Sequence, residues 1–235
     1  MGKAGRPPRD PARQAERAHR ILDAVAELVL RWGYDKTTID DIAQRAGVAK
    51  GTIYLHWKTR DEIFAALLRR ERVLMATEVR DRAPGTIGEL FGEFARALLR
   101  RPLLQAVLTG DSQVLGKLTR QKRTSTRWTL TEAAFDPYVA ELVKRGAIRE
   151  DPGEHLVTVG SIVYGFLFLR ESLPDELRPS DERIAELVAD TIERALTTSR
   201  PLPPADAEAV ARATLEFLDA SVEVAQSKLA ASLGL

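Results

Sequence analysis

The sequence predicts an all-α protein, and three observations carry that prediction. Apolar residues recur at helical spacing along most of the 235 residues. Alternating apolar and polar runs of the kind that form strands are nearly absent. Glycine and proline punctuate the chain where one periodic segment ends and the next begins. The expected helices cover about residues 11–32, 39–46, 50–57, 59–82, 87–101, 103–108, 112–118, 125–144, 154–172, 180–197 and 205–233.

The chain begins with a basic arm, residues 1–19, that leads into the first helix. Prolines keep its first half extended. The cationic residues of the arm are Lys3, Arg6, Arg9, Arg13 and Arg17, and Arg20 follows directly after it. Arms of this kind reach into DNA minor grooves, although a solubilising tail is the alternative for the first half. The first helix ends at Gly33, and its apolar stripe should support the segment that follows.

Residues 37–64 have the pattern of two short helices joined at a glycine and followed by a third helix. Thr38 is a favourable N-cap, and Asp41 can return a bond to the amide of the cap. Gly47 follows where the first short helix must end, because glycine adopts a positive φ at little cost. The apolar face of that helix is formed by Ile39, Ile42, Ala43 and Ala46.

The second short helix begins near Lys50, and only Ile53 and Trp57 share an inward face. Its other side is polar, aromatic and cationic, which suits a DNA major groove. Three ordinary solvated helices are the plainer interpretation, but this concentration of residue types favours DNA. The sequence from Thr59 to Glu62 is a full capping box, and it opens a helix long enough to join this unit to the rest of the chain.

These residues resemble the DNA-binding domain of the tetracycline-repressor (TetR) family of bacterial transcription regulators. The resemblance covers about residues 21–68 with fixed spacing and no gap. It is carried by Gly33-Tyr34, Thr37-Thr38, Asp41-Ile42-Ala43, Ala46-Gly47-Val48, Lys50-Gly51-Thr52-Ile53-Tyr54 and His56-Trp57-Lys58. It implies a three-helix, helix-turn-helix DNA-binding domain over residues 20–66. A helical ligand-binding and dimerisation domain would occupy residues 67–235.

The resemblance also implies which residues touch DNA. Base-edge contacts are expected from Lys50, Gly51, Thr52, Tyr54 and Leu55. Phosphate contacts are expected from Thr38, Tyr54, His56, Lys58 and Arg60. Ala49 stands where a serine often caps the recognition helix in the family, and Leu55 replaces an aromatic or basic residue, so its base contact would be apolar. His56 could equally be a satisfied histidine at the helix end.

The helices of residues 67–235, the body of the protein, are expected to enclose an apolar small-molecule pocket, as the resemblance implies. The candidate lining residues are Phe91, Phe94, Leu98, Gln105, Trp128, Phe135 and Phe166, with Arg127 or Tyr138 as further polar contacts. Plain core packing is the alternative for each aromatic residue. Nothing in the sequence identifies the ligand.

Residues 154–172 are apolar on more than one face, which indicates a dimer interface. One face should pack in its own chain and the other, together with residues 180–197, against a second copy in a four-helix bundle. A buried central helix of a monomer is the alternative. The candidate interface residues are Val159, Ile162, Val163, Phe166, Leu187, Val188 and Thr191.

The last helix, about residues 205–233, follows a proline-rich break and is an addition to the body. Its apolar stripe favours packing on the body over engaging a partner. The stripe consists of Leu215, Leu218, Val222, Ala225 and Leu229.

The net charge of +1 conceals an uneven distribution. Residues 1–60 hold 12 Lys and Arg against 7 Asp and Glu, a net +5, and the remainder holds 23 against 27, a net −4. The basic end therefore coincides with the helix-turn-helix pattern, as a phosphate-binding surface requires.

Composition excludes several function classes. The chain has no cysteine, which rules out disulfides, thiolate metal sites and cysteine nucleophiles. Its three histidines are far apart in sequence, so neither a metal nor a cofactor is expected, and no cluster of catalytic residues suggests an enzyme. No apolar run approaches the roughly 20 residues of a membrane span, and no signal peptide is evident, so a cytoplasmic protein without membrane contact is expected.

The sequence thus predicts a DNA-binding transcription regulator. The favoured form is a homodimeric repressor that binds a palindromic operator and is released by a small-molecule ligand. The alternatives are a ligand-independent or activating regulator, and a protein that binds DNA without sequence preference. The last would need basic charge spread through the chain rather than gathered at one end.

Overall fold

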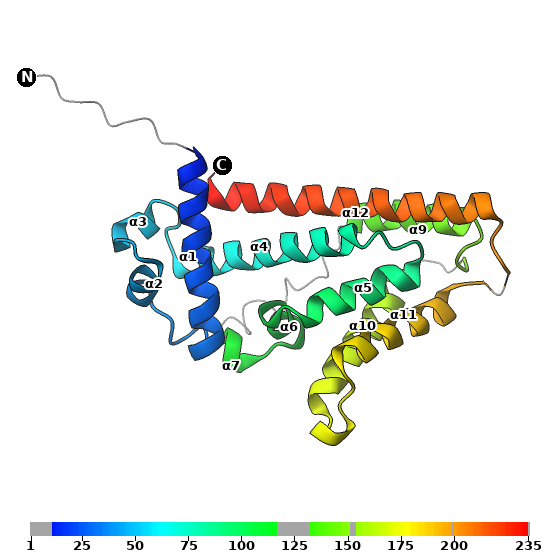
Figure 1. Cartoon of the computed structure of the whole chain (residues 1–235), viewed down its shortest axis with the longest axis horizontal. Helices are drawn as coiled ribbons and strands as arrows, with labels where there is room; N and C mark the ends of the chain where they lie inside the picture. Colours follow the sequence, from blue (N-terminus) through cyan, green and yellow to red (C-terminus); the bar gives the residue numbers. More distant parts are fainter. Residues whose placement is uncertain (1–10, 117–131, 151–153, 199, 235) are drawn as a thin grey trace, which may run out of the picture.

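The computed structural model describes residues 11–116, 132–150, 154–198 and 200–234, which form an all-helical protein (Figure 1). Within these ranges no β-strand forms, apart from an isolated bridge between Ile148 and Thr197. The helices are α1 (Pro11–Trp32), α2 (Ile39–Ala46), α3 (Lys50–Tyr54), α4 (Arg60–Asp81), α5 (Ile87–Leu99), α6 (Pro102–Thr109), α7 (Ser112–Leu115), α9 (Glu132–Lys144), α10 (His155–Ser172), α11 (Asp181–Leu196) and α12 (Pro204–Leu233), with a 3-10 helix η1 (Asp175–Leu177). The predicted fold class is confirmed.

The helices α1, α2 and α3, with the first two turns of α4, form a small head at one end of the molecule (Figure 1). Isoleucines from all four helices are fully buried where they meet: Ile21, Ile42, Ile53 and Ile63. Tyr34 packs edge-on against Phe64, with ring centroids 5.3 Å apart. The inward stripe predicted for residues 39–46 and the anchor Ile53 therefore form the core of the head.

The helix α4 carries the chain from the head into the remaining helices, which we call the body. It buries Ile63 and Leu67 in the head and Val79 near its far end. The buried side chains of the described residues form one connected cluster that extends from α1 to α12. The head is therefore joined to the body by continuous packing, and the division of the chain at residue 66 stays a prediction.

The helices α5 and α11 pack against each other through two glycines of α5. A Cβ built on Gly92 would lie 2.9 Å from the Cβ of Ala189 and 3.2 Å from the carbonyl oxygen of Ala185. At Gly88 the neighbours are the carbonyl of Ala189 and the carboxylate of Glu193, which also accepts a bond from the Gly88 amide. Only glycine allows the two helices to approach so closely.

The final helix, α12, lies along α4 and also contacts α9 (Figure 1). The ring of Tyr138 in α9 stacks on Phe217 in α12 at 5.0 Å, and its hydroxyl is 3.2 Å from that of Thr214. Of the stripe predicted for this helix, Leu218 and Leu229 are buried and the other three residues are partly buried. The prediction that α12 packs on the body is confirmed.

Two local expectations need correction, and one short element was not expected. Glu62 donates its amide to Thr59 Oγ1 at 3.1 Å, but its carboxylate accepts from the amide of Lys58 rather than that of Thr59, so the box at Thr59 is only half formed. Pro102 begins α6 because a proline fits the first turn of a helix. The 3-10 turn η1 was not predicted.

No helix in the described ranges is long and apolar enough to cross a membrane.

We expect Gly92→Val to destabilise the fold, because the added methyl groups must push α5 away from α11. Overpacking of this kind costs about 1–3 kcal/mol, which thermal or denaturant unfolding would measure. The control is Gly51→Val, since no atom lies within 4 Å of a Cβ built on Gly51. An unchanged unfolding midpoint for Gly92→Val would contradict the close α5–α11 contact.

Candidate nucleic-acid interface

The start and end of α2 are fixed by the interactions that the sequence predicted. Thr38 Oγ1 accepts a bond from the Asp41 amide at 3.2 Å, and Asp41 Oδ2 accepts from the Thr38 amide at 3.0 Å. These bonds with Thr38 hold the pKa of the Asp41 carboxyl below its ordinary value. Gly47 ends the helix with φ of 64°, in the left-handed region. The amide of Val48 then bonds to the carbonyl of Ala43 at 3.0 Å, which sets the direction of the turn.

The short helix α3 buries one side and exposes the other. Ile53 and Trp57 are buried, as predicted. The residues expected at base edges lie on the outside: Lys50, Gly51, Tyr54 and Leu55 are exposed, and Thr52 is half-buried. Nothing lies within 4 Å of a Cβ at Gly51, so this stretch of backbone is open to close approach. The N-cap Ala49 makes no side-chain bond, as expected for alanine.

An ion pair links the first turns of α2 and α3. Lys50 Nζ donates to Asp40 at 2.9 Å, and this bond holds the pKa of the lysine above its ordinary value. Both side chains are well exposed, so water and salt weaken their attraction. A base contact from Lys50, as predicted, would compete with Asp40 for the ammonium group, and the Asp40 carboxylate would repel DNA phosphates. We therefore expect Asp40 to oppose DNA binding at this surface.

The residues predicted to contact phosphate have different surroundings. The hydroxyl of Thr38 donates to Asp41 Oδ2 at 2.6 Å, so a phosphate would have to compete with that carboxylate for the hydrogen. Lys58 is exposed, and its side chain is free to follow a DNA backbone. His56 is half-buried beside Trp57, with ring centroids 5.2 Å apart.

Arg60 fixes the loop that precedes α2, a role that sequence reasoning missed. Its Nη1 donates to the carbonyl oxygens of Thr37 at 2.6 Å and Asp35 at 3.3 Å. Its guanidinium carbon lies 4.1 Å from the ring centroid of Tyr34. Burial raises the pKa of Tyr34 to about 12, and the Tyr34 hydroxyl donates to Asp61. A phosphate contact from Arg60 would use its remaining N–H groups.

Two further contacts join the head to the body at sites that the sequence did not indicate. The Tyr34 amide donates to the carbonyl of Val114 in α7 at 2.8 Å. The indole Nε1 of Trp57 donates to the carbonyl of Ser232 in α12 at 2.9 Å. The second pair is separated by 175 positions, and no local pattern relates such distant residues.

The head matches a known family of sequences. Residues 21–67 match the profile of bacterial regulatory proteins of the tetR family. The head is a DNA-binding domain of the TetR family. Proteins of this family are DNA-binding transcription regulators and are not enzymes.

Individual TetR-family proteins are similar over different lengths. The transcriptional repressor KstR of Mycolicibacterium smegmatis is 33% identical over 102 residues, which cover 41% of this chain and 50% of KstR. The match therefore spans only half the length of that relative. An uncharacterised HTH-type transcriptional regulator of Mycobacterium bovis is 25% identical over 182 residues, 74% of this chain and 92% of that protein. A solved TetR-family structure from Mesorhizobium loti, at 18% identity, shares the fold with a TM-score of 0.56 over 79% of this chain and 99% of that chain.

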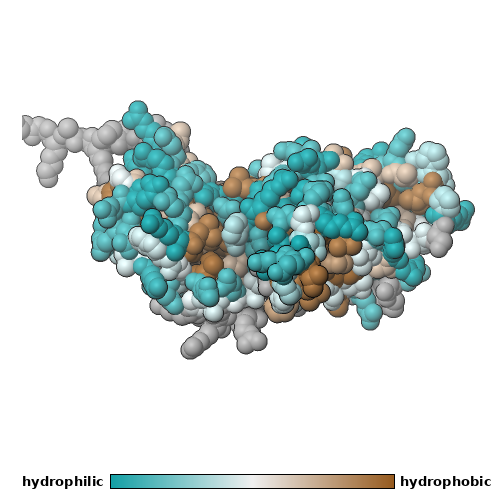
Figure 2. Space-filling model, turned by 60° about the horizontal axis from the view of Figure 1, so that its bottom comes forward, coloured by the Kyte–Doolittle hydropathy of each residue, from teal (hydrophilic) through white to brown (hydrophobic). Residues whose placement is uncertain are grey.

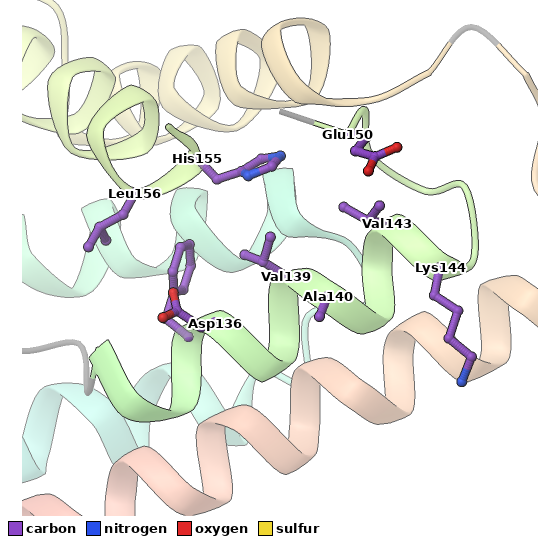
Figure 3. Close-up of a pocket in the computed structure, with 9 residues that line it drawn as sticks. Asp136, Val139, Ala140, Val143, Lys144, Glu150, His155 and Leu156 are labelled. Carbon is purple, nitrogen blue, oxygen red and sulfur yellow. The ribbon is translucent and has the colours of Figure 1, made fainter. Parts of the chain in front are cut away.

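A pocket of about 380 Å³ lies in the body, beside α9 (Figure 3). One wall is α9, and His155 and Leu156 at the start of α10 face it, with Glu150 at one end (Figure 3). Its lining is mostly apolar and includes Phe135, Val139 and Val143. His155 is buried, and its Nε2 lies 2.9 Å from the carbonyl oxygen of Arg149.

Of the predicted lining residues that the structure describes, Phe135 alone lines this pocket. Phe91, Phe94 and Leu98 are buried in the adjoining core, and the ring of Phe91 lies 6.3 Å from that of Phe135. Gln105 uses its amide to donate to the Leu99 carbonyl at 2.7 Å. Phe166 is partly buried against the core. Trp128 and Arg127 lie outside the described residues.

The helix α10 is apolar on two faces, as predicted, but several residues lie on the opposite face from the one expected. Val159 and Val163, and Val188 in α11, are buried inside the chain. The prediction that these three contact a second copy is wrong, because they have no exposed surface to offer. Ile162, Phe166, Leu187 and Thr191 are partly buried and keep some surface.

We expect Lys50→Ala and Tyr54→Ala to weaken binding to a selected duplex, meaning one enriched from random sequences by the wild-type protein. The loss of a base contact is worth about 1–3 kcal/mol, or roughly 5- to 150-fold in affinity. Asp40→Asn should act in the opposite direction, because it frees Lys50 and removes a negative charge. Titration of labelled duplex would measure all three, with Lys144→Ala in the body as the matched control. Unchanged affinity in both Lys50→Ala and Tyr54→Ala would refute the assignment of α3.

Lys58→Ala should weaken binding to selected and random duplexes by the same factor, because a phosphate contact carries no sequence information. The slope of log affinity against log salt should become shallower by about 0.9 for each Lys58 that meets a phosphate. Titrations at several salt concentrations measure that slope. A loss confined to the selected duplex would rule out the phosphate role.

Proposed function

We propose that this TetR-family regulator is a homodimeric repressor that binds a palindromic operator through α3 and is released by a small apolar ligand. The observation that carries the proposal is an exposed apolar face on α10, on the side of the body away from α12 (Figure 1). A dimer would present two heads to DNA, and its formation would bury this apolar face. The name of KstR, a repressor, favours repression over activation.

The exposed face belongs to α10 and follows the spacing of a helix–helix seam. Val157, Ser161, Tyr164 and Phe168 lie one turn apart along one side of the helix and are all exposed. We call these four residues the outer face of α10. The rings of Tyr164 and Phe168 stack on each other at 5.4 Å, outside the core. Figure 2 shows hydrophobic surface among hydrophilic residues on this side of the molecule.

Small residues beside the outer face favour another helix as its occupant. Nothing lies within 4 Å of a Cβ at Gly160 or Gly165, so the backbone is accessible there. The helix α11 packs beside α10 and presents the partly buried Leu187 and Thr191. Two such helix pairs related by a two-fold axis would make a four-helix bundle and cover the apolar side chains. A second copy is therefore the partner that fits this face.

A two-fold dimer carries two heads, and its operator should share that symmetry. Recognition helices of such dimers enter successive major grooves about 34–36 Å apart, so the half-sites are expected one helical turn apart. Residues 1–60 carry a net charge of +5, and this basic charge supports binding of the heads to DNA phosphates.

Release by a ligand is supported by the pocket on α9. Its volume, about 380 Å³, lies in the range of small-molecule sites, and its mostly apolar wall fits an apolar ligand. Such a ligand lowers DNA affinity only if it binds better to a conformation whose heads are wrongly placed.

We expect Phe168→Glu to dissociate the dimer, because a carboxylate cannot be buried in an apolar seam without a partner. Sedimentation at micromolar protein would show half the mass of the wild type. Leu74→Glu is the matched control, because Leu74 is 49% exposed and Phe168 47%, but Leu74 lies on α4. A monomeric wild type, or a Phe168→Glu variant with wild-type mass, would contradict the dimer.

A further inference from the structure

The last turn of α12 lies against the residue that follows the recognition helix. Trp57 is three positions beyond Tyr54, the last residue of α3, and only 3% of it is exposed. Its indole nitrogen donates to the carbonyl of Ser232 at 2.9 Å. The guanidinium of Arg69, in α4, bonds to the hydroxyl of the same serine. Ser232 in the last turn of α12 thus meets both the α3–α4 connection, through Trp57, and α4, through Arg69.

The bond between Trp57 and Ser232 gives a partner to two groups that need one, a buried indole N–H and a carbonyl in the last turn of a helix. An indole N–H can only donate, and a buried one needs an acceptor. The carbonyls in the last turn of a helix have no amide ahead of them, and the Gly234 amide uses only that of Ala230. The C-terminal end of α12 is also the negative end of its dipole, which favours Arg69 beside it.

Apolar packing supports the same contact. Leu229 and Leu233 lie one turn apart on α12, and both are buried. They belong to the connected core that contains Trp57. Neighbouring residues of the last turn, Ala231 and Gly234, are exposed. The end of α12 is therefore held on the side that faces the head.

The rest of α12 is fixed to α4, so its last turn cannot move alone. The two helices lie side by side in opposite directions. Arg80 of α4 donates to Asp219 of α12 at 2.8 Å, about three turns along α4 from the Arg69–Ser232 contact. With 30 residues, α12 is about 45 Å long, which is enough to span the body and reach the head.

We propose that α12 is a positioning element of the DNA-binding head: its last turn fixes the direction of α3 through Trp57. Trp57, Ser232 and Leu233 are positioning residues that touch no DNA. The proposal rests on the proposed function in one respect: one of its two experiments uses a selected duplex, which requires that the protein prefers a DNA sequence. A second measurement, on the protein without DNA, does not depend on it.

The first experiment compares Trp57→Phe with Trp32→Phe. Phenylalanine keeps the ring in the core but removes the donor to Ser232, whereas Trp32 lies in the same head and is 39% exposed. Loss of one hydrogen bond should weaken binding to the selected duplex by roughly 3- to 10-fold for Trp57→Phe. Binding to random duplex should stay within about twofold, because misdirection of α3 leaves phosphate contacts in place. Trp32→Phe should match the wild type on both duplexes.

The second experiment measures the position of the head by pulsed electron paramagnetic resonance. The chain has no cysteine, so Gln44→Cys in α2 and Glu208→Cys in α12 give two unique labelling sites, both exposed. Dilution into unlabelled protein reports the distance within one chain, whether or not the chain dimerises. The distance distribution should be narrow with wild-type Trp57 and Leu233. It should broaden in Trp57→Phe and in Leu233→Ala.

The outcomes separate the two proposals. Broadened distances with a weakened preference for the selected duplex support positioning by α12. Narrow distances and an unchanged preference in both variants overturn it. Equal losses on selected and random duplexes, together with a lower unfolding temperature, also overturn it, since they indicate a damaged fold. If no duplex is enriched by selection, the proposed function fails, and the distances alone decide the role of α12.

Discussion

The direction of the recognition helix depends on the burial of Trp57. Because α3 has only five residues, it cannot fix its own orientation, and Ile53 is its single buried residue. Trp57 supplies the second anchor just beyond the helix, so the outer residues from Lys50 to Leu55 are turned to solvent together. The residues of that outer surface keep this common direction only while Trp57 stays buried.

Besides the continuous apolar packing along α4, two hydrogen bonds join the head to the body, Tyr34–Val114 and Trp57–Ser232. Because of these contacts, the head cannot move relative to the body by bending α4 alone. The pocket wall α9 packs on α12 through Tyr138 and Phe217, and α12 reaches Trp57. Under the proposed function, a ligand that shifted α9 would act on a helix whose other end contacts Trp57.

Sequence reasoning succeeded where the determining interactions are local. The cap at Thr38, the turn at Gly47 and the anchors Ile53 and Trp57 all follow from residue type and spacing over a few positions. Some helix boundaries follow for the same reason, such as the ends of α1 before Gly33 and of α2 before Gly47, whereas Pro137 lies inside α9.

It failed where residues far apart in sequence meet. Periodicity showed that α10 has two apolar faces but could not tell which face is inside, so Val159 and Val163 were placed on the wrong one. The pairing of Lys50 with Asp40 and the contacts of Arg60 depend on how α2, α3 and α4 cross. The contact of Ser232 with the head depends on the path of the whole chain.

The central claim is that two copies of α3 read a symmetric DNA site, and the sequence of the preferred site tests it most directly. Wild-type protein can be used to enrich duplexes from a random library, followed by sequencing of the bound fraction. The account predicts an inverted repeat whose half-sites are about one helical turn apart. Enrichment of a single, asymmetric site, or of no sequence at all, would contradict it.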